Sequence, residues 1–259
     1  MNTLQACIGG VGFWSDGLPS WAAARDFVLH DILAADAPAK PSPQLLAPNE
    51  RRRAPASVAM ALDVAMAACT DAGVDPASLP SVFASTHGDL VITDYMCATL
   101  ANDPRALSPT RFHNSVHNAA AGYWTIGTGC VQPATAISSY DASFAQGLLE
   151  AMSQLAAGAD AVLLAAYDTE ASGPLAAISG TQGLLGGALV LTHACAGTRL
   201  RATLVDGEAP TGTGPLARRA AHNAMAPMLP FFDALATGSD LVLLKSGPGR
   251  MLRVEFAHD

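Results

Sequence analysis

The order of apolar runs and polar breaks along the chain predicts alternating strands and helices. Leu4 to Phe13, an apolar run with paired glycines, and Pro80 to Thr86 (PSVFAST) are predicted as strands. The apolar spacing from Trp21 to Ile32 predicts a helix, and the run SVAMALDVAMAACTDAG predicts another that ends at Gly73. A further helix is predicted from Leu90 to Asn102. Such alternation is typical of an α/β domain.

The stretch from Ser108 to Asp160 is the part around which the rest of the chain is organised. Its pieces, in order, are a small-residue helical pattern (Ser108 to Gly129), a short apolar run (Val131 to Ile137), a strongly helical pattern (Ser138 to Gly158) and a buried strand (Asp160 to Tyr167). Together they predict a βαβ unit, in which the turn Ser138–Asp141 lies at a helix N-terminus. Nucleophiles and anions are often held at such a place.

After Asp168 the pattern predicts a loop, antiparallel strands and short helices. The predicted elements are a small-residue loop (Gly173 to Gly183), two consecutive antiparallel strands joined at Ala196 and Gly197 (Gly187 to Thr192 and Leu200 to Val205), two helices (Pro215 to Ala224 and Met228 to Ala236) and a closing hairpin (Asp240 to Lys245 and Met251 to Phe256). They indicate one mixed α/β domain with helices on both faces of its sheet.

The composition of the chain indicates that it binds another protein. Charged residues make up 14% of the chain, against about 25% in a typical soluble domain, while hydrophobic residues reach 50%. We expect a chain so poor in charge to bury much of its surface against a partner. With 14 Lys and Arg residues and a net charge of −8, the chain lacks the cations that nucleic-acid binding requires.

The cysteines and the hydropathy pattern set further limits. The five cysteines (Cys7, Cys69, Cys97, Cys130 and Cys195) form no CxxC spacing, so we expect buried, reduced thiols in a cytoplasmic protein, with no metal and no cofactor. The start, MNTLQACIGGVGFW, lacks the basic residues and long apolar core of a signal peptide. No uncharged apolar run reaches the roughly 18 residues that a membrane span requires.

Histidines supply two further candidate sites. His113 and His117 have the HxxxH spacing that places two imidazoles on one helix face, but the central Glu of zinc proteases is missing. Surface or interface histidines are therefore favoured over a metal site. His87 and Asp89 flank a glycine after a strand, where a base with its orienting carboxylate is one interpretation and a hydrogen-bonded turn is the favoured one.

The turn from Ser138 to Asp141 contains no cysteine, and no serine flanked by the glycines of a nucleophile elbow. Ser138 or Ser139 with a histidine is one candidate nucleophile, but helix N-capping by serine or aspartate explains the same residues and is favoured. Upstream, Asn49 is a candidate cap for a helix that begins with three arginines. We expect these arginines to be solvated or to face an acidic partner, rather than to bind phosphate.

Four segments of the chain carry a family likeness. FASTHGDL is similar to a strand and glycine loop, and SPTRFHNSVHNAAAGYWTIGTG to an SP…N…AAG…I…G segment in which Asn118, Ala121 and Gly122 match. GADAVLLAAYD is similar to a G-A-D-x-x-L-A-G-G strand, and GGALVLT to a later crossover strand. In this order the segments resemble the N-terminal half of β-ketoacyl synthases, which have the thiolase fold, over roughly Leu4 to Gly207.

The departures from this family concern catalysis. In an active synthase the strand before the long helix ends in a Cys that a carrier protein acylates, and here that place falls on Tyr140 or Asp141. Neither residue is a thiolate. The family's catalytic histidines and lysine lie in a C-terminal half that is replaced here by a short tail from Thr211 to Asp259. The resemblance therefore implies a chain without independent condensing activity.

Small proteins of this kind resemble the chain-length factors of type II polyketide systems, especially those of aryl polyene and xanthomonadin-like pigments. The resemblance implies a heterodimer with a catalytic β-ketoacyl synthase, or a homodimer, that works with acyl carrier protein and pairs through the strand before the long helix. The implied interface residues are Asn118, Val131, Gln132, Ala134, Thr135, Ala136 and Ile137. The implied carrier-docking residues are Arg51, Arg52 and Arg53.

The predicted fold is α/β: a thiolase-like N-terminal half with a mixed five-stranded-type sheet and helices on both faces, plus a short C-terminal helix and hairpin extension. Residues 1–210 are expected to form the synthase-like domain, and residues 211–259 an extension packed on it.

Two other functions stay open. One is a divergent acyltransferase or hydrolase acting on carrier-protein or coenzyme A thioesters, which requires a histidine within hydrogen-bond reach of Ser138 or Ser139. The other is a homodimeric scaffold for acyl carrier protein, which requires a basic patch. The subunit function requires an exposed apolar face beside Val131 to Ile137.

Overall fold

The computed structural model of the 259-residue chain describes residues 3–193 and 196–258. Its strands are β1 (Leu4–Ser15), β2 (Ser81–Ala84), β3 (Ala134–Ile137), β4 (Ala161–Asp168), β5 (Leu185–Thr192), β6 (Arg199–Asp206), β7 (Leu241–Gly247) and β8 (Arg250–Ala257). Its α-helices are α1 (Trp21–His30), α2 (Pro48–Arg53), α3 (Ala56–Ala72), α4 (Leu90–Asn102), α5 (Pro109–Asn114), α6 (Ala119–Thr128), α7 (Ser143–Ala156), α8 (Gly173–Ser179), α9 (Pro215–Arg219) and α10 (Leu229–Thr237). Short 3-10 turns are η1 (Pro76–Ser78), η2 (Pro104–Ala106), η3 (Tyr140–Ala142) and η4 (Ala226–Met228). No helix among the described residues is long and apolar enough to cross a membrane.

The strands of the described residues form one mixed sheet of eight strands in the order β3-β2-β4-β5-β1-β6-β8-β7. The strands β3, β2 and β4 are parallel, and the other neighbours are antiparallel. The predicted α/β class with helices on both faces is confirmed. The sheet is wider than the predicted five strands, because β6, β8 and β7 continue it beyond β1.

The position of β1 in the sheet corrects one predicted hairpin. β1 pairs with β5 from Cys7 to Ser15 and with β6 from Leu4 to Cys7. The strands β5 and β6, expected to pair with each other, therefore lie on opposite sides of β1. The N-terminal strand takes this interior place because it is apolar and buried along most of its length.

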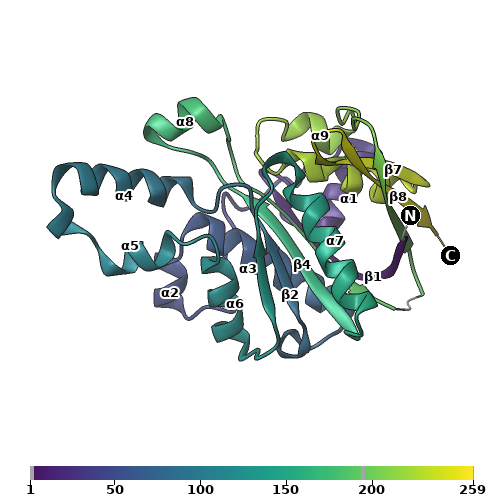
Figure 1. Ribbon diagram of the computed structural model, residues 1–259, viewed down its shortest axis with the longest axis horizontal. Helices are drawn as coiled ribbons and strands as arrows, with labels where there is room; N and C mark the ends of the chain where they lie inside the picture. Colours follow the sequence, from purple (N-terminus) through teal and green to yellow (C-terminus); the bar gives the residue numbers. More distant parts are fainter. Residues whose placement is uncertain (1–2, 194–195, 259) are drawn as a thin grey trace.

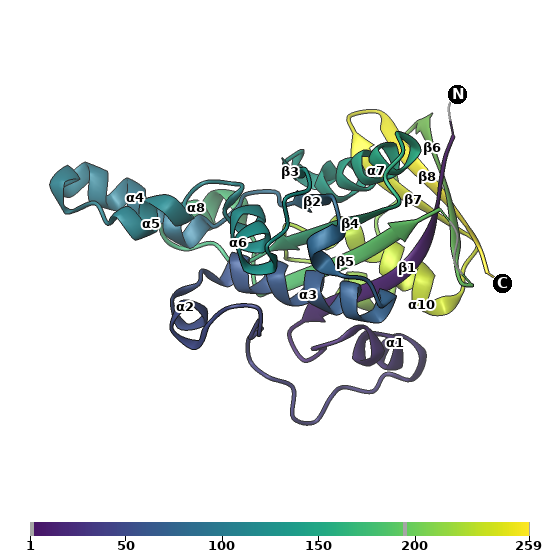
Figure 2. The ribbon, with the colours of Figure 1, turned by 90° about the horizontal axis from the view of Figure 1, so that it is seen from below.

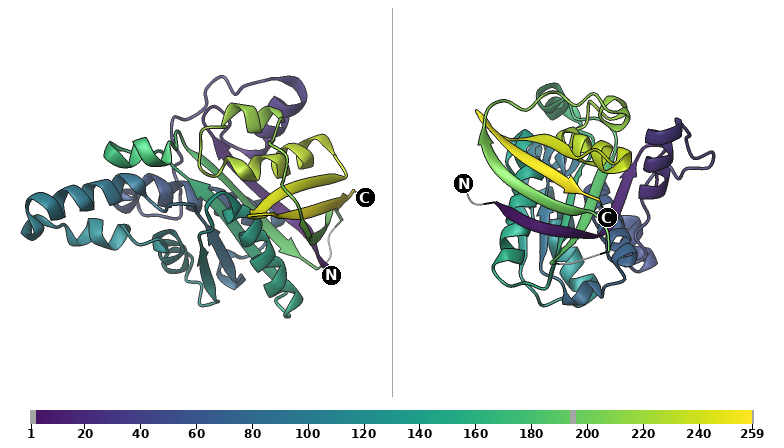
Figure 3. Two further views of the ribbon diagram at one scale, coloured as in Figure 1. Left: turned by 45° about the horizontal axis from the view of Figure 1, so that its top comes forward. Right: turned by 90° about the vertical axis from the view of Figure 1, so that its right-hand side faces the viewer.

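Two hydrophobic cores lie on opposite faces of the strands β3-β2-β4-β5-β1. Helices α3 and α6 pack on one face, and α7 and α10 fill the space between the other face and the strands β6, β8 and β7. In Figure 3 these three strands turn away from the plane of the others. A Cβ atom on Gly12 would lie 2.0 Å from the carbonyl oxygen of Val64, so β1 rests directly on α3, as its glycines predict.

Helix α7 holds the turn between β3 and α7 in place. Its buried face includes Phe144, Leu148 and Met152, which pack against the sheet. Gly147 permits the close approach, since a Cβ there would lie 2.9 Å from Cδ1 of Leu164. With the helix fixed along this face, its first turn lies at the end of β3.

Residues 211–258 are built into the same core as the rest of the described chain. The predicted closing hairpin is β7–β8, and β8 pairs with β6 over that strand's whole length. Phe232 of α10 lies 5.3 Å from Phe13 of β1, measured between ring centroids. Helix α9 ends at Arg219, earlier than predicted. The domain boundary at residue 210 stays a prediction.

Several local predictions are wrong for identifiable reasons. Asn49 lies inside α2, whose N-cap is Ala47, and Pro55 separates α2 from α3 because proline restricts the residue before it. The helical pattern from Ser108 to Gly129 is divided into α5 and α6. The small-residue loop after Asp168 contains α8, which has Pro174 in its first turn and is capped at its C-terminus by Gly180.

Helices α4 and α5 form an arm that projects away from the sheet, with α8 beside it (Figures 1 and 2). Asp89 accepts hydrogen bonds from the Ile92 amide (2.9 Å) and from the Ser57 hydroxyl (2.8 Å), so it caps α4 and ties the arm to α3. The arm is therefore anchored firmly at its base.

The cysteines partly contradict the expectation of five reduced thiols. Cys69 and Cys130 are buried and free, and burial together with Asp75 raises the pKa of Cys69 to about 12. Cys97 is exposed and free, whereas Cys7 is disulfide-bonded. Cys7 lies between Thr192 of β5 and Arg199 of β6, an environment created by long-range pairing that spacing along the sequence does not reveal. Cys195 lies outside the described residues.

Candidate functional site

Three loops meet where the parallel strands β2, β3 and β4 end. They comprise residues 85–89, 138–141 and 168–169, and the carboxyl ends of parallel strands are where α/β folds bind ligands. The Ser138 hydroxyl donates to the Thr86 carbonyl (2.9 Å), and the Thr86 amide donates to Oδ2 of Asp168 (2.9 Å). The three loops thus form one hydrogen-bonded unit.

Tyr140 occupies the sharpest part of this unit, in the turn from β3 to α7. Its φ of 50° lies in the left-handed region that non-glycine residues adopt at a cost of about 1–2 kcal/mol. The Ser143 hydroxyl donates to the Tyr140 carbonyl (2.6 Å) and accepts from the Ser139 amide (2.9 Å), which stabilises the turn. A strained residue between a strand and a helix is the geometry of a nucleophile elbow.

The Tyr140 side chain points outward, and 76% of its surface is exposed. Its ring meets that of His87 edge-on, with 6.2 Å between centroids. The phenol is therefore displayed at the surface rather than packed in the core. The strained turn holds an exposed aromatic side chain where an elbow would hold a nucleophile.

The predicted helix capping by this turn is wrong. Helix α7 has Ala142 as its N-cap, without a side-chain hydrogen bond, and Ser139 makes no cap bond to η3. Ser138 bonds to the β2 loop instead, and Asp141 forms an ion pair. The polar residues of the turn connect it to other loops.

Asp141 joins the turn to the last part of the chain. Its Oδ2 lies 2.6 Å from Nζ of Lys245 in β7, and about half of each side chain is exposed. The hydrogen bond and the negative charge of Asp141 raise the pKa of Lys245. A cavity of about 430 Å³ beside the pair is walled by Leu243, Pro227 and Pro230, among others. Sequence reasoning missed Lys245, which is 104 positions from its partner.

Asp168 is the centre of the hydrogen-bond network beneath the turn. Its carboxylate accepts from the Ser85 hydroxyl (2.7 Å) and from the amides of Thr86 (2.9 Å) and His87 (3.3 Å). Asn223 donates to its backbone carbonyl (3.3 Å). Burial raises the pKa of Asp168, and these hydrogen bonds oppose the shift. The sequence signal for this role is an aspartate at the end of an apolar strand, and the sequence analysis did not identify Asp168 as a site residue.

The histidine candidates lie in different local structures. His113 lies in α5 and His117 in the turn after it, so the expectation of one shared helix face is wrong. The Nε2 atom of His117 bonds to the Ser85 carbonyl (2.9 Å). In the described part of the chain, no group of ligands could hold a metal, and no histidine is hydrogen-bonded to Ser138 or Ser139.

His87 and Asp89 belong to a hydrogen-bonded turn, which is the interpretation that the sequence favoured over a catalytic base with its orienting carboxylate. The Asp89 carboxylate accepts hydrogen bonds from Ser57 and Ile92. The amide of Gly88, which lies between His87 and Asp89 in the chain, donates to the Ser85 hydroxyl (2.8 Å).

Strand β3 lies at one edge of the sheet, which is the position expected for pairing with another protein. From Phe112 to Tyr140 the sequence contains no Asp, Glu, Lys or Arg. Val131 is 93% exposed and Ile126 of the adjacent α6 is 80% exposed. Of the other interface candidates, Asn118, Gln132 and Ala134 are exposed, and Thr135, Ala136 and Ile137 are half-buried. The edge is therefore apolar, uncharged and open.

The arginines of α2 lie apart from this edge. Arg51 turns inward and donates to the Leu46 carbonyl (2.9 Å), while Arg52 bonds to Asn49. Arg52 and Arg53 are exposed, but Glu50 in the same helix offsets part of their charge.

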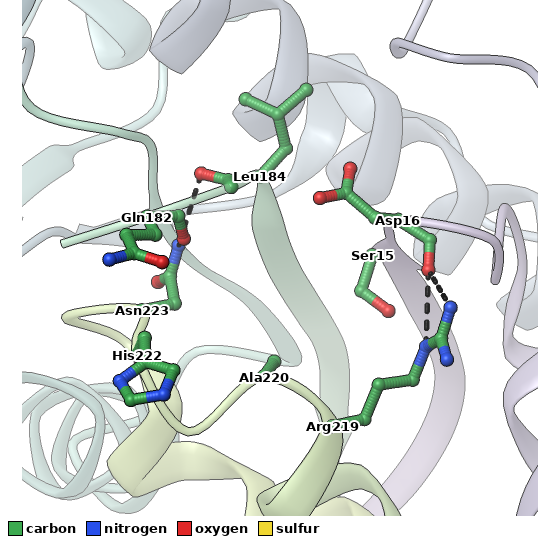
Figure 4. A pocket seen from close by; sticks show the side chains of 9 residues that line it. Ser15, Asp16, Gln182, Leu184, Arg219, Ala220, His222 and Asn223 are labelled. Atoms are coloured by element: carbon green, nitrogen blue, oxygen red, sulfur yellow. Dashed lines mark hydrogen bonds between the residues drawn. The ribbon is translucent and has the colours of Figure 1, made fainter.

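A second cavity, of about 360 Å³, lies near the start of β5 and is shown in Figure 4. Arg219 donates two N–H groups to the Asp16 carbonyl there, at 2.9 and 3.2 Å. Asn223 reaches the same cavity, donating to the Gln182 carbonyl at 3.0 Å. This cavity is polar and separate from the Tyr140 turn.

Comparison with known families identifies the chain. The family model "Beta-ketoacyl synthase, N-terminal domain" matches residues 21–245, which is most of the sequence. The chain belongs to this family. A search of curated proteins gave no match. Tyr140, with its left-handed backbone, and Asp141 lie in the turn on which the predicted place of the family's reactive cysteine falls.

Solved structures of similar fold match nearly the whole chain. A ketosynthase (ApeO) in complex with its chain length factor (ApeC) from Xenorhabdus doucetiae matches with 22% identity and a TM-score of 0.76, covering 97% of this chain and 99% of that chain. The ishigamide ketosynthase/chain length factor matches with 14% identity and a TM-score of 0.72, covering 98% and 99%. AntDE:AntF, a type II PKS acyl-carrier protein in complex with its ketosynthase, matches with 12% identity and a TM-score of 0.73, covering 100% of both chains. The predicted synthase-like fold is confirmed.

Proposed function

We propose that this protein is a non-catalytic, chain-length-factor-like subunit that pairs with a true β-ketoacyl synthase and acyl carrier protein in type II polyketide or fatty-acid-type synthesis. Condensation takes place on the partner. This chain supplies surface that bounds the growing product. The proposed product class is an aryl polyene or xanthomonadin-like pigment, and the proposed location is cytoplasmic.

The observation that carries the proposal is the open edge of the sheet at β3. An edge strand offers unpaired N–H and C=O groups to a strand of another protein. Here Val131 and Ile126 add exposed apolar surface beside that edge. Large exposed side chains in an uncharged stretch are typical of a surface that another subunit covers.

The turn at Tyr140 supports the non-catalytic part of the proposal. A phenol is a poor acyl acceptor in thioester exchange compared with a thiolate. Among the described residues, no base is hydrogen-bonded to the Tyr140 phenol. The turn nevertheless keeps its strained backbone. Tyr140 and Asp141 therefore serve as shape and contact residues at the site.

The test is co-expression of the chain with candidate synthases, followed by size-exclusion chromatography and intact-mass measurement after loading with acyl carrier protein. We expect co-elution with one synthase and an acyl adduct on the synthase alone. An acyl adduct on this chain would overturn the non-catalytic assignment. A stable monomer that ignores every synthase would overturn the subunit assignment, and a homodimer without synthase would support the scaffold instead.

A further inference from the structure

The strands β6, β8 and β7 present an outer face that differs from the rest of the surface. Their inner side chains, such as Leu200, Leu252 and Val254, belong to the main core with α7 and α10. In Figure 2 these strands lie at one end of the molecule, with both helices on their inner side. In β7, Leu243 and Lys245 also line the cavity of about 430 Å³ together with Pro227 and Pro230, which lie in η4 and α10.

Strand register defines what this outer face displays. One row across the three strands is Arg201, Glu255 and Leu241, and the next is Thr203, Arg253 and Leu243. A third row is Val205, Met251 and Lys245. The face is thus an apolar patch of half-buried and exposed side chains bordered by cations. We call this surface the cationic sheet face.

The charge of the cationic sheet face is opposite to that of the whole chain. Glu255 is the one carboxylate among the outward positions of these strands in the part of the chain that the structure describes, and Asp206 at the end of β6 pairs with Arg250. Outside the strands, Asp141 and Glu208 lie near Lys245 and offset its charge, so the excess positive charge is that of the arginines. Glu255 lies between Arg201 on the facing strand and Arg253, whose Nη2 is 3.0 Å from Oε1 of Glu255. Arg199, exposed at the start of β6, extends the row. The chain as a whole has a net charge of −8.

The cationic sheet face also leads to the Tyr140 turn. Lys245 stands in its third row and makes the ion pair with Asp141, the residue after Tyr140. A partner seated on the face would therefore lie next to the strained turn. The arginines of α2 have no such connection, and Arg51 is committed to the Leu46 carbonyl.

We propose that the cationic sheet face docks an acidic protein surface, that of the acyl carrier protein. This inference rests on the proposed function, because that function supplies the carrier. Arginine and methionine around an apolar centre suit a protein interface, and the opposite charges would speed the encounter. The face, rather than the predicted Arg51–Arg53 site, then determines carrier binding.

The experiment measures fluorescence anisotropy of a labelled acyl carrier protein of net negative charge, titrated with the full chain, alone and co-purified with its synthase. We expect Arg201→Glu and the double variant R201E/R253E to weaken binding at least tenfold. Wild-type binding is expected to weaken as salt rises. The matched control R52E/R53E on α2 is expected to change binding less than twofold.

Each other outcome contradicts the proposal. Equal carrier binding by wild type and R201E/R253E would overturn it, as would a loss confined to R52E/R53E. Binding of a duplex DNA probe in place of the carrier would assign the face to a different partner. Arg201→Gln, which adds no negative charge beside Glu255, repeats the test should the double variant fold poorly. Synthase pairing, read separately by size-exclusion chromatography, is expected to be unchanged in all variants, so failure of the proposed function is distinguishable.

Discussion

The two ends of the sheet have opposite surface chemistry. At the β3 end, residues 112–140 contain no Asp, Glu, Lys or Arg, and Val131 and Ile126 are exposed. At the other end, Arg201, Arg253 and Lys245 border the outer face of β6, β8 and β7. An uncharged apolar edge suits a permanent, fully dehydrated interface, whereas a cationic face suits a partner that arrives and leaves. One sheet therefore offers two partners two different kinds of contact.

The two ends come together at the Tyr140 turn. Strand β3 runs directly into the turn, and β7 reaches it through Lys245 and through Ser246, whose carbonyl accepts from Gln146 of α7 at 2.7 Å. The strand order places β3 and β7 farthest apart, so this meeting depends on the curl of the sheet. The turn is thus the common border of both proposed contacts.

The largest expected effect comes from placing charge on the β3 end. Ile126→Asp with Val131→Asp is expected to weaken synthase binding at least 100-fold, because two carboxylates would be buried without partners in the interface. Both side chains are exposed in the single chain, so its melting temperature should hardly change. Size-exclusion chromatography and calorimetry provide the measurements.

The matched control lies at the other end of the sheet. Leu241, 45% exposed in β7, is changed to Asp in the same way. Unchanged synthase binding is expected, and a comparable loss there would remove the distinction between the two ends.

Asp168 is the next test, because its network supports the turn at which the ends meet. Asp168→Asn is expected to lower the free energy of unfolding by about 1–3 kcal/mol, since an amide N–H₂ would face donors where the carboxylate accepts three hydrogen bonds. Urea unfolding at neutral pH measures the change. A variant as stable as the wild type would mean that the network is not needed for the turn.

The pH dependence of the same variant has a defined sign. Burial raises the pKa of Asp168 above its ordinary value of 3.8, so the folded state holds the proton more tightly than the unfolded state. Protonated Asp168 contributes fully to the free energy of unfolding at pH values below 3.8. This contribution is lost as the pH rises through the raised pKa of Asp168 in the folded state. As the pH falls through that window, the wild type should gain stability relative to Asp168→Asn, in unfolding curves recorded at several pH values.

Tyr140→Gly is expected to raise the free energy of unfolding by about 1 kcal/mol, because glycine adopts a φ of 50° without strain. Tyr140→Ala is the control, since alanine keeps the strain and loses the ring. Thermal melts of both variants report the difference. Equal melting temperatures for Gly and Ala would show that the backbone strain at this position is negligible.

The smallest expected effect concerns the Asp141–Lys245 pair. Lys245→Met should change the free energy of unfolding by less than about 1 kcal/mol, because both side chains are about half exposed and water screens the pair. High salt should reduce even this difference in urea unfolding curves. A larger effect would mean that the pair holds the curled sheet together.

The sequence pattern predicts the elements well and their arrangement in part. The apolar runs that became β1, β2 and β4 and the helix that ends at Gly73 follow from local periodicity, with Gly73 at a φ of 66°. The separation of β5 from β6 by β1 does not follow, because it depends on pairing across most of the chain. Local pattern carries little information about such partners.

The candidate site shows the same division. The turn Ser138–Asp141 and the edge position of the strand before it were predicted from the βαβ pattern and the family resemblance. The roles of Asp168, Asn223 and Lys245 were not, because each acts on residues more than 40 positions away. Residues that tie distant loops together leave no local signature beyond a polar residue next to an apolar run.

The central place of β1 has a consequence for how the chain folds. Strand β1 pairs with β5 and β6, which begin at Leu185 and Arg199, so its hydrogen bonds to neighbouring strands form only after most of the sequence between them has been synthesised. Contacts of such long sequence separation close slowly, and an unpaired apolar strand is prone to aggregate meanwhile. Synthesis beside a partner or chaperone that shields Leu4–Ser15 should therefore raise the yield of folded protein.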